Sequence, residues 1–203
     1  MATDRPKVCI LGTGRSGSGY IAAVLSEAGV ACGHEAWWNP LGDRAEGLAA
    51  DSSWCALPEV LDDPMVTCFL QVRHPLKVVA SLVASPDWGP YLGPRAALGF
   101  ASQGDPVRAA MALYVGWNRV CLSRSLSWWR VEDLTGYELR GVAGRLGIGL
   151  PMEAGEAAIS VTPTNFNAHG GDLTLTWADL PAGPERAALW TCAERFGYDP
   201  EEP

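Results

Sequence analysis

The stretch Lys-Val-Cys-Ile-Leu-Gly-Thr-Gly-Arg-Ser-Gly-Ser-Gly, residues 7–19, joins an apolar run to a glycine-rich loop. A short apolar run without polar alternation is typical of a strand that is covered on both faces of a parallel sheet. From Ser18 the apolar residues recur at helical spacing up to Ala28, and Gly29 then marks a helix end. We therefore expect the chain to open with a strand, a glycine loop and a helix.

Strand and helix signals alternate along the rest of the chain. Three further strands are predicted from short apolar runs, at 30–32, 65–72 and 127–131. Four further helices are predicted from their apolar spacing and caps, at 76–83, from 106 onward, at 137–146 and at 184–196. This alternation predicts an α/β fold, a three-layer αβα arrangement with a central, mainly parallel sheet. We expect a single domain over residues 1–203.

Three segments carry no regular pattern and are rich in Gly, Pro, Trp and Asp: 36–62, 85–104 and 151–183. In α/β proteins such insertions often lie over the C-terminal edge of the sheet, where ligands bind. We therefore expect a ligand site at that edge.

The charge balance is acidic, with 15 Lys and Arg against 23 Asp and Glu in 203 residues and a net charge of −8. Binding to a polyanion depends on a surplus of basic side chains across one face, so nucleic acid is not an expected partner. No run approaches the roughly 18 apolar residues that span a bilayer. Residues 1–7 lead into a strand-like run rather than a signal-peptide core, so we expect a cytoplasmic protein without an integral membrane segment.

The cysteines and histidines give no metal-site pattern. The 6 cysteines form no Cys-x-x-Cys pair, and the 3 histidines are not at ligand spacing. We expect reduced cysteines in the core and no metal.

The glycine loop fits three phosphate-binding patterns to different degrees. Residues 12–17, Gly-Thr-Gly-Arg-Ser-Gly, match the dinucleotide fingerprint G-x-G-x-x-G, and Glu35 lies about where a ribose-binding acid falls. The same spacing fits a nucleoside-triphosphatase P-loop, but Ser18-Gly19 stand where that motif needs Lys and then Ser or Thr. The third interpretation takes residues 15–19 as an anion cradle of helix N-terminal amides, two hydroxyls and a guanidinium.

Residues 15–19, Arg-Ser-Gly-Ser-Gly, resemble the 5′-phosphosulfate loop of sulfotransferases, where Arg or Lys precedes Ser-Gly-Thr-Thr or a near variant. Arg73-His74-Pro75, with Ser81 eight residues after the Arg, resembles the 3′-phosphate motif of the same family. Residues 130–134, Arg-Val-Glu-Asp-Leu, are partly similar to the Tyr-Glu-Asp-Leu that ends a later strand in that family. The resemblance implies the P-loop NTPase-like sulfotransferase fold.

The resemblance also implies a reaction: transfer of a sulfuryl group from 3′-phosphoadenosine 5′-phosphosulfate to an acceptor hydroxyl or amine, by in-line displacement without a metal. Arg15 is then expected to stabilise the negative charge that develops on the leaving phosphate. The residues implied for binding this co-substrate are Gly14, Arg15, Ser16, Gly17, Ser18, Gly19, Tyr20, Arg73 and Ser81. Among them, Tyr20 takes the place of a Trp that packs on the adenine in cytosolic relatives. The C-terminal Gly-x-x-Gly-x-Trp loop of those relatives is missing, and residues 164–170 are the expected substitute.

Two neighbouring residues are candidates for the catalytic base. Cys32-Gly33-His34-Glu35 resembles the Cys-Gly-Glu-Glu of tyrosylprotein sulfotransferases, whose base carboxylate aligns best with Glu35. His34 is the alternative, because cytosolic relatives use a His and an unperturbed imidazole titrates near pH ~6.5. Trp37, Trp38 and Trp54 follow the expected base and are either walls of an acceptor pocket or core residues.

Two other kinds of function stay open at this point. One is a different nucleotide-dependent enzyme, an NAD dehydrogenase or a P-loop phosphotransferase, and the other is an inactive nucleotide-binding protein on the same fold. For a sulfotransferase, we expect a small-molecule, sugar or lipid-headgroup acceptor, since an acidic chain is a poor match for anionic polymers. The sequence leaves the oligomeric state open.

Overall fold

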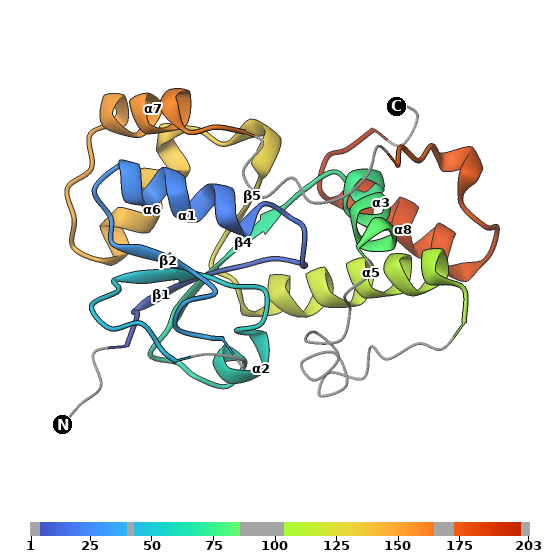
Figure 1. The fold of residues 1–203 in the computed structure, drawn as a ribbon, viewed down its shortest axis with the longest axis horizontal. Helices are drawn as coiled ribbons and strands as arrows, with labels where there is room; N and C mark the ends of the chain where they lie inside the picture. Colours follow the sequence, from blue (N-terminus) through green and yellow to red (C-terminus); the bar gives the residue numbers. More distant parts are fainter. Residues whose placement is uncertain (1–4, 40–42, 86–103, 165–172, 200–203) are drawn as a thin grey trace.

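The computed structural model describes residues 5–39, 43–85, 104–164 and 173–199. Within them, one sheet is formed by β1 (Val8–Leu11), β2 (Cys32–His34), β3 (Ala50–Ser52), β4 (Thr67–Val72) and β5 (Trp128–Arg130). The order across this 5-stranded sheet is β2-β3-β1-β4-β5, and every neighbouring pair runs parallel. The predicted parallel α/β architecture is confirmed (Figure 1).

Two strands differ from the sequence-based prediction. The predicted strand 30–32 overlaps β2 only at Cys32, because the amide of Val30 still closes the turn after the first helix by donating to Leu25 at 2.9 Å. β3 lies inside the unpatterned segment 36–62 and was not predicted. Its sequence, Ala-Asp-Ser, has no apolar run, although all three residues are buried. The sheet therefore contains a polar strand between β2 and β1.

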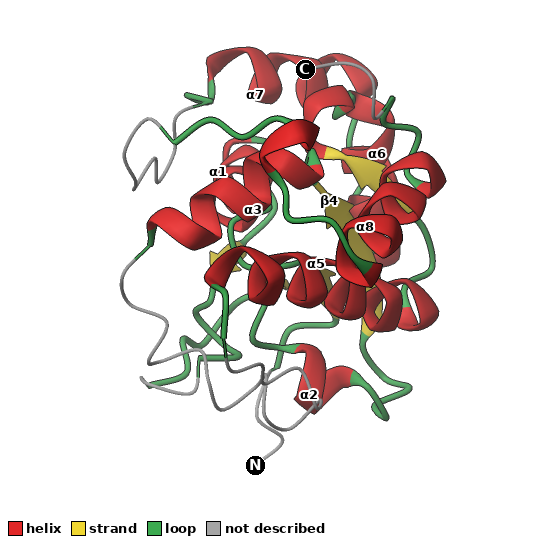
Figure 2. Ribbon diagram, turned by 90° about the vertical axis from the view of Figure 1, so that its right-hand side faces the viewer, coloured by secondary structure: helices red, strands yellow, loops and turns green. Residues whose placement is uncertain are grey.

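Helices cover both faces of the sheet, as predicted for three layers. α1 (Ser18–Glu27), α6 (Gly136–Arg145) and α7 (Met152–Val161) pack on one face, over Val8 and Ile10 of β1. α2 (Leu57–Val60), α3 (Pro75–Ala84), α5 (Pro106–Arg124) and α8 (Pro184–Arg195) contribute to the core on the other face, over Cys9 and Leu11. Successive residues of β1 thus serve opposite cores, as the strand period requires. Figure 2 looks onto the side formed by α3, α5 and α8.

The helix ends follow local capping chemistry. Asp105 accepts the amide of Val107 at 2.8 Å and caps α5. Thr135 and Glu138 form a capping box at the start of α6. α7 was not predicted, because its packing depends on small residues: a Cβ added to Gly155 would lie 2.9 Å from the Cα of Gly136.

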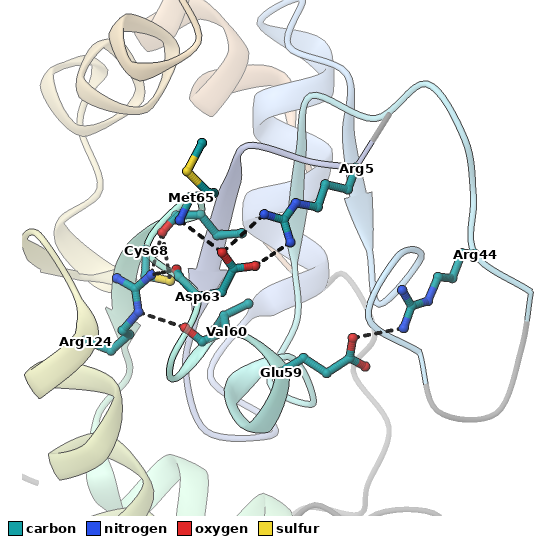
Figure 3. A network of polar contacts seen from close by, with 9 residues as sticks. Arg5, Arg44, Glu59, Val60, Asp63, Met65, Cys68 and Arg124 are labelled. Atoms are coloured by element: carbon teal, nitrogen blue, oxygen red, sulfur yellow. Dashed lines mark hydrogen bonds and ion pairs between the residues drawn. The ribbon is translucent and has the colours of Figure 1, made fainter. Parts of the chain in front are cut away.

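Arg124 ties the end of α5 to the segment that precedes β4 (Figure 3). Its guanidinium donates to the carbonyl oxygens of Val60 at 2.8 Å, of Val66 at 2.7 Å and of Asp63. The Asp63 carboxylate accepts the Met65 amide at 3.0 Å and pairs with Arg5. This network lies where β4 begins, at the opposite edge of the sheet from the carboxyl ends of the strands, and is therefore away from the predicted site residues.

Candidate active site

The carboxyl ends of the strands bring the predicted site residues to one edge of the sheet. β1 leads into the glycine loop 12–17, β2 ends at His34 beside Glu35, and β4 ends just before Arg73. Ligands of open α/β sheets bind at this edge. In a dinucleotide-binding sheet the second strand lies next to the first, whereas here β3 separates β2 from β1. Glu35 is therefore not on the strand that the NAD interpretation requires.

Contacts from β4 and β5 hold the glycine loop in shape. Gln71, only 1% exposed, donates from Nε2 to the Ser16 carbonyl oxygen at 2.9 Å and accepts from Trp129 Nε1 at 3.2 Å. The Ser16 amide donates to the Thr13 carbonyl at 3.1 Å. The Ser16 hydroxyl is buried over Gly12, where an added Cβ would come within 2.4 Å of Ser16 Oγ. The loop backbone is thus fixed by buried contacts.

The start of α1 offers backbone donors to an anion. Gly17 is the N-cap residue, with φ 91° and no side-chain cap, so no side chain of its own covers the first amides of the helix. The Thr13 hydroxyl in the same loop is 1% exposed and has no hydrogen-bond partner among the described residues. Amides and the positive end of a helix dipole attract phosphate groups, so this loop fits one.

Arg15, Arg73 and Ser81 are brought into contact from three parts of the chain. Arg15 Nε donates to Ser81 Oγ on α3 at 2.9 Å, and Arg73 Nη1 donates to the Arg15 carbonyl oxygen at 3.3 Å. Tyr114 of α5 donates its hydroxyl to the Arg73 carbonyl at 2.8 Å. The loop and the Arg73–Ser81 motif therefore form one hydrogen-bonded unit that presents two guanidiniums.

The two candidate bases lie side by side next to the loop. His34 Nε2 is 3.0 Å from Ser18 Oγ and 3.4 Å from Glu35 Oε1, and both side chains are partly exposed. In a Ser-His-acid relay the acid binds the other ring nitrogen, so this arrangement is not such a relay. Glu35 has φ 51° and Arg15 has φ 73°, and they are the non-glycine residues with positive φ in the part of the chain that the structure describes. Strained backbone of this kind often occurs at functional sites.

The third predicted motif also reaches the loop. Val131, in the short 3₁₀ helix Val131–Asp133, lies against Gly17: a Cβ added to Gly17 would be 3.2 Å from Val131 Cγ2. Glu132 accepts the amide of His74 at 3.0 Å and the hydroxyl of Tyr198 at 2.8 Å. The motif thus joins the turn that carries Arg73 to the segment after α8.

The aromatic side chains near the site are mostly buried. Trp37, Trp38 and Trp54 are 5%, 4% and 5% exposed and belong to the core that α5 covers, which agrees with the core alternative. Trp54 packs against Trp117 with ring centroids 5.6 Å apart. Tyr20 is 9% exposed in the other core, and burial raises the pKa of its hydroxyl. Any contact of Tyr20 with a ligand is therefore limited to a small part of its ring.

The cysteines are unpaired, and most are core residues, as predicted. Cys9, Cys55, Cys68 and Cys121 are buried, while Cys32 and Cys192 are half-buried. Burial raises the pKa of Cys68 to about 11 and that of Cys55 to about 12, so both thiols are neutral at physiological pH. They are not candidates for a nucleophile.

Sequence reasoning missed the polar residues that support the site. Gln71 gave a usable signal, as a polar residue next to the end of a mostly apolar run that precedes Arg73. Asp51 lies in β3, which was itself missed, and Tyr114 is indistinguishable from a core aromatic. Of the predicted substitute loop 164–170, only Thr164 lies within the described residues.

Two kinds of feature are absent from the described ranges. No helix there is both long and apolar enough to cross a membrane. No group of three or more His, Cys, Asp or Glu side chains in those ranges has metal-binding geometry.

Comparison with solved structures identifies the fold. A sulfotransferase domain from the curacin biosynthetic pathway matches with a TM-score of 0.55 and 14% identity, covering 96% of this chain and 98% of that one. A sulfotransferase domain from the Synechococcus PCC 7002 olefin synthase matches with a TM-score of 0.55 and 16% identity, covering 98% of this chain and 97% of that one. No protein-family model and no curated protein matches the sequence. The chain therefore has the sulfotransferase fold over nearly its whole length, as its motifs predicted.

Proposed function

We propose that this protein is a sulfotransferase that moves a sulfuryl group from 3′-phosphoadenosine 5′-phosphosulfate to an acceptor hydroxyl or amine. The observation that carries the proposal is the direct contact of Arg15 with Ser81 and of Arg73 with the Arg15 carbonyl. The two motifs assigned to the 5′ and 3′ ends of one nucleotide thereby meet at one edge of the sheet. The Arg73 and Ser81 pair has no counterpart in the binding of NAD by a dehydrogenase.

Local charge explains how an acidic chain can hold an anionic co-substrate. The net charge is −8, but Arg15, Arg73 and the uncapped start of α1 gather positive potential at one place. The loop amides and Ser18 would bind the 5′-phosphate, and Arg73 with Ser81 would bind the 3′-phosphate. Charge-assisted hydrogen bonds from guanidinium to phosphate are among the stronger polar contacts in proteins.

In the proposed transfer, the acceptor oxygen or nitrogen attacks sulfur in line with the leaving phosphate. A bond forms from the acceptor to sulfur, and the bond from sulfur to the 5′-phosphate oxygen breaks, with its electron pair staying on the phosphate. Arg15 stabilises that charge. Glu35 takes the acceptor proton, with His34 as the alternative base, because His34 contacts Ser18 at the start of α1 and Glu35 contacts His34.

For the acceptor we propose a small molecule, a sugar or a lipid headgroup. The acidic chain disfavours anionic polymers. We propose that the protein acts in the cytoplasm, where thiols stay reduced, in agreement with its 6 unpaired cysteines.

Calorimetry with 3′-phosphoadenosine 5′-phosphate, NAD and ATP-magnesium tests the nucleotide assignment. We expect binding of the bisphosphate alone. Binding of NAD or ATP without the bisphosphate would overturn the proposal in favour of another nucleotide-dependent enzyme.

A transfer assay with radiolabelled donor and a panel of phenols, sugars and glycerolipid headgroups tests the activity. Glu35→Gln should keep bisphosphate affinity while turnover collapses, whereas retained turnover would assign the base to His34. Bisphosphate binding by the wild type without transfer to any acceptor of the panel would instead indicate an inactive nucleotide-binding protein.

A further inference from the structure

A fully buried carboxylate lies directly behind the candidate base. Asp51 of β3 is 0% exposed, and its two oxygens accept three successive backbone amides: Ala36 at 3.2 Å, Trp37 at 3.1 Å and Trp38 at 3.2 Å. These amides immediately follow Glu35. The carboxylate therefore binds the turn that carries the candidate base rather than another side chain.

The neighbouring residues of β3 complete the attachment of this turn. The Glu35 amide donates to the Ser52 carbonyl at 3.1 Å, so four consecutive amides, residues 35–38, point toward β3. Ser53 Oγ donates to the Trp38 carbonyl at 3.2 Å. Glu35 has φ 51° within this turn, a conformation that costs about 1 to 2 kcal/mol for a residue other than glycine. The bonds to β3 are what hold the turn in that conformation.

Gly33 makes the room that this carboxylate needs. A Cβ added to Gly33 would lie 2.7 Å from Asp51 Oδ1, 2.7 Å from the Ala36 Cβ and 2.6 Å from a Leu48 methyl carbon. The glycine of the Cys32–Glu35 segment thus permits the close approach of Asp51 to the turn.

The chemistry of the contact selects a carboxylate. Burial raises the pKa of Asp51 above its ordinary value, and the three amides and the nearby His34 offset only part of that rise. An Asn in the same position would direct an amide group with two hydrogens at one or two backbone N–H donors, so it could not accept all three amides. A charged acceptor with two oxygens satisfies all of them.

We propose that Asp51 is a positioning residue for sulfuryl transfer. It fixes the Glu35 backbone so that the Glu35 carboxylate stands beside His34 and the start of α1, where the acceptor must meet the 5′-phosphosulfate. Asp51 acts through Glu35 and touches neither substrate. This inference rests on the proposed function.

Asp51→Asn is the direct test, in the full chain. We expect kcat to fall roughly 100-fold, because displacement of a reacting group by about 1 Å has that effect, while the Kd for 3′-phosphoadenosine 5′-phosphate stays within about twofold. Asp63→Asn is the matched control: Asp63 also accepts a backbone amide, from Met65 at 3.0 Å, but at the opposite edge of the sheet. The kcat of the Asp63→Asn variant should equal that of the wild type.

Two further measurements keep the test decisive. Gly33→Ala crowds the Asp51 carboxylate and should give the same selective loss of kcat. This variant replaces Asp51→Asn as the test if Asp51→Asn does not fold. The amide resonances of residues 36–38 report the hydrogen bonds without any assay of activity, and they should move upfield in both variants.

The outcomes separate this inference from the proposed function. A wild type that binds no bisphosphate, or transfers to no acceptor, overturns both. An active wild type overturns the role of Asp51 alone if Asp51→Asn keeps kcat within about twofold, or if bisphosphate affinity falls as much as kcat does.

Discussion

Arg15 Nε donates a hydrogen bond to Ser81 Oγ at 2.9 Å, across 66 positions of sequence. This contact joins a loop that follows β1 to a helix that follows β4. Arg73 adds a second contact to the same loop, because its Nη1 donates to the Arg15 carbonyl at 3.3 Å. The residues assigned to the 5′ and 3′ phosphates are therefore in direct contact. The effect of a variant at either site is best measured as the change in affinity for two ligands that differ by a single phosphate.

Arg73→Ala should weaken binding of 3′-phosphoadenosine 5′-phosphate by about 2 to 4 kcal/mol, since a charge-assisted contact to phosphate is removed. Binding of adenosine 5′-monophosphate, which lacks the 3′-phosphate, should change much less. Titration calorimetry with both ligands measures the difference. Ser81→Ala should show the same selectivity with a smaller loss, about 1 kcal/mol, because one neutral donor is removed.

Arg140→Ala serves as the charge-matched control for Arg73→Ala. Arg140 is exposed on α6, so its loss changes the net charge equally without removing a residue of the site. Equal losses for the bisphosphate and the monophosphate in Arg73→Ala would contradict the 3′-phosphate assignment.

Most of the fold follows from local signals in the sequence. The runs that became β1, β4 and β5 are apolar enough to be recognised alone, and Asp105 and Pro106 mark the start of α5. β3 could not be recognised, because Asp51 and Ser52 look like loop residues until β1 and β2 supply their hydrogen-bond partners. α7 depends on the fit of Gly155 against Gly136, which is a tertiary property.

Glu35→Gly should be more stable than Glu35→Ala by about 1 kcal/mol, because glycine adopts positive φ without the steric cost that alanine has. The φ of 51° at Glu35 is the cause of the expected difference. Chemical denaturation of the two variants measures it. Both should lose turnover, since both lack the carboxylate.

The same pair of substitutions at Arg140 should give the opposite order. Arg140 lies inside α6, where glycine is less favourable than alanine by about 1 kcal/mol. If alanine were the more stable residue at both positions, the left-handed backbone at Glu35 would be refuted.

The site itself was only partly accessible to sequence reasoning. Motif spacing identified the residues with charged or hydroxyl groups, Arg15, Arg73 and Ser81, and the structure brings these into contact. The supporting residues were not accessible, because a buried Gln or Asp acquires its role from partners that are distant in sequence. Gln71 is the clearest case, with both of its partners, Ser16 and Trp129, on other elements.

Gln71→Met should destabilise the protein by about 1 to 3 kcal/mol, because it leaves the Ser16 carbonyl and the Trp129 indole N–H buried without their partner. Affinity for adenosine 5′-monophosphate should fall as well, since the loop amides lose their fixed orientation. Thermal unfolding and calorimetry give the two readouts.

Asn118→Leu is the contrasting variant for Gln71→Met. Asn118 is also fully buried, but its amide group has no hydrogen-bond partner among the described residues, so replacement by an apolar side chain should not lower stability. A comparable loss in both variants would show that volume, and not the hydrogen bonds of Gln71, determines the effect.

Asp63 gives a pH-dependent prediction at the stabilising network (Figure 3). The Met65 amide, followed by the Arg5 side chain, holds the pKa of Asp63 below its ordinary value of 3.8. Because the folded-state pKa is the lower one, the contribution of Asp63 to stability is present above pH 3.8 and is lost as the pH falls through the folded-state pKa. Asp63→Asn should therefore lower the free energy of unfolding at pH 7 by less than about 1 kcal/mol, as expected for a partly exposed pair. The difference from wild type should shrink toward pH ~2, as the Asp63 carboxylate of the folded wild type takes up its proton. Urea unfolding at pH 7 and at pH ~2 measures the difference.

Glu59→Gln, which removes a more exposed pair with Arg44, should have little effect at either pH. A deficit of Asp63→Asn that is equal at both pH values would mean that charge plays no part in this network.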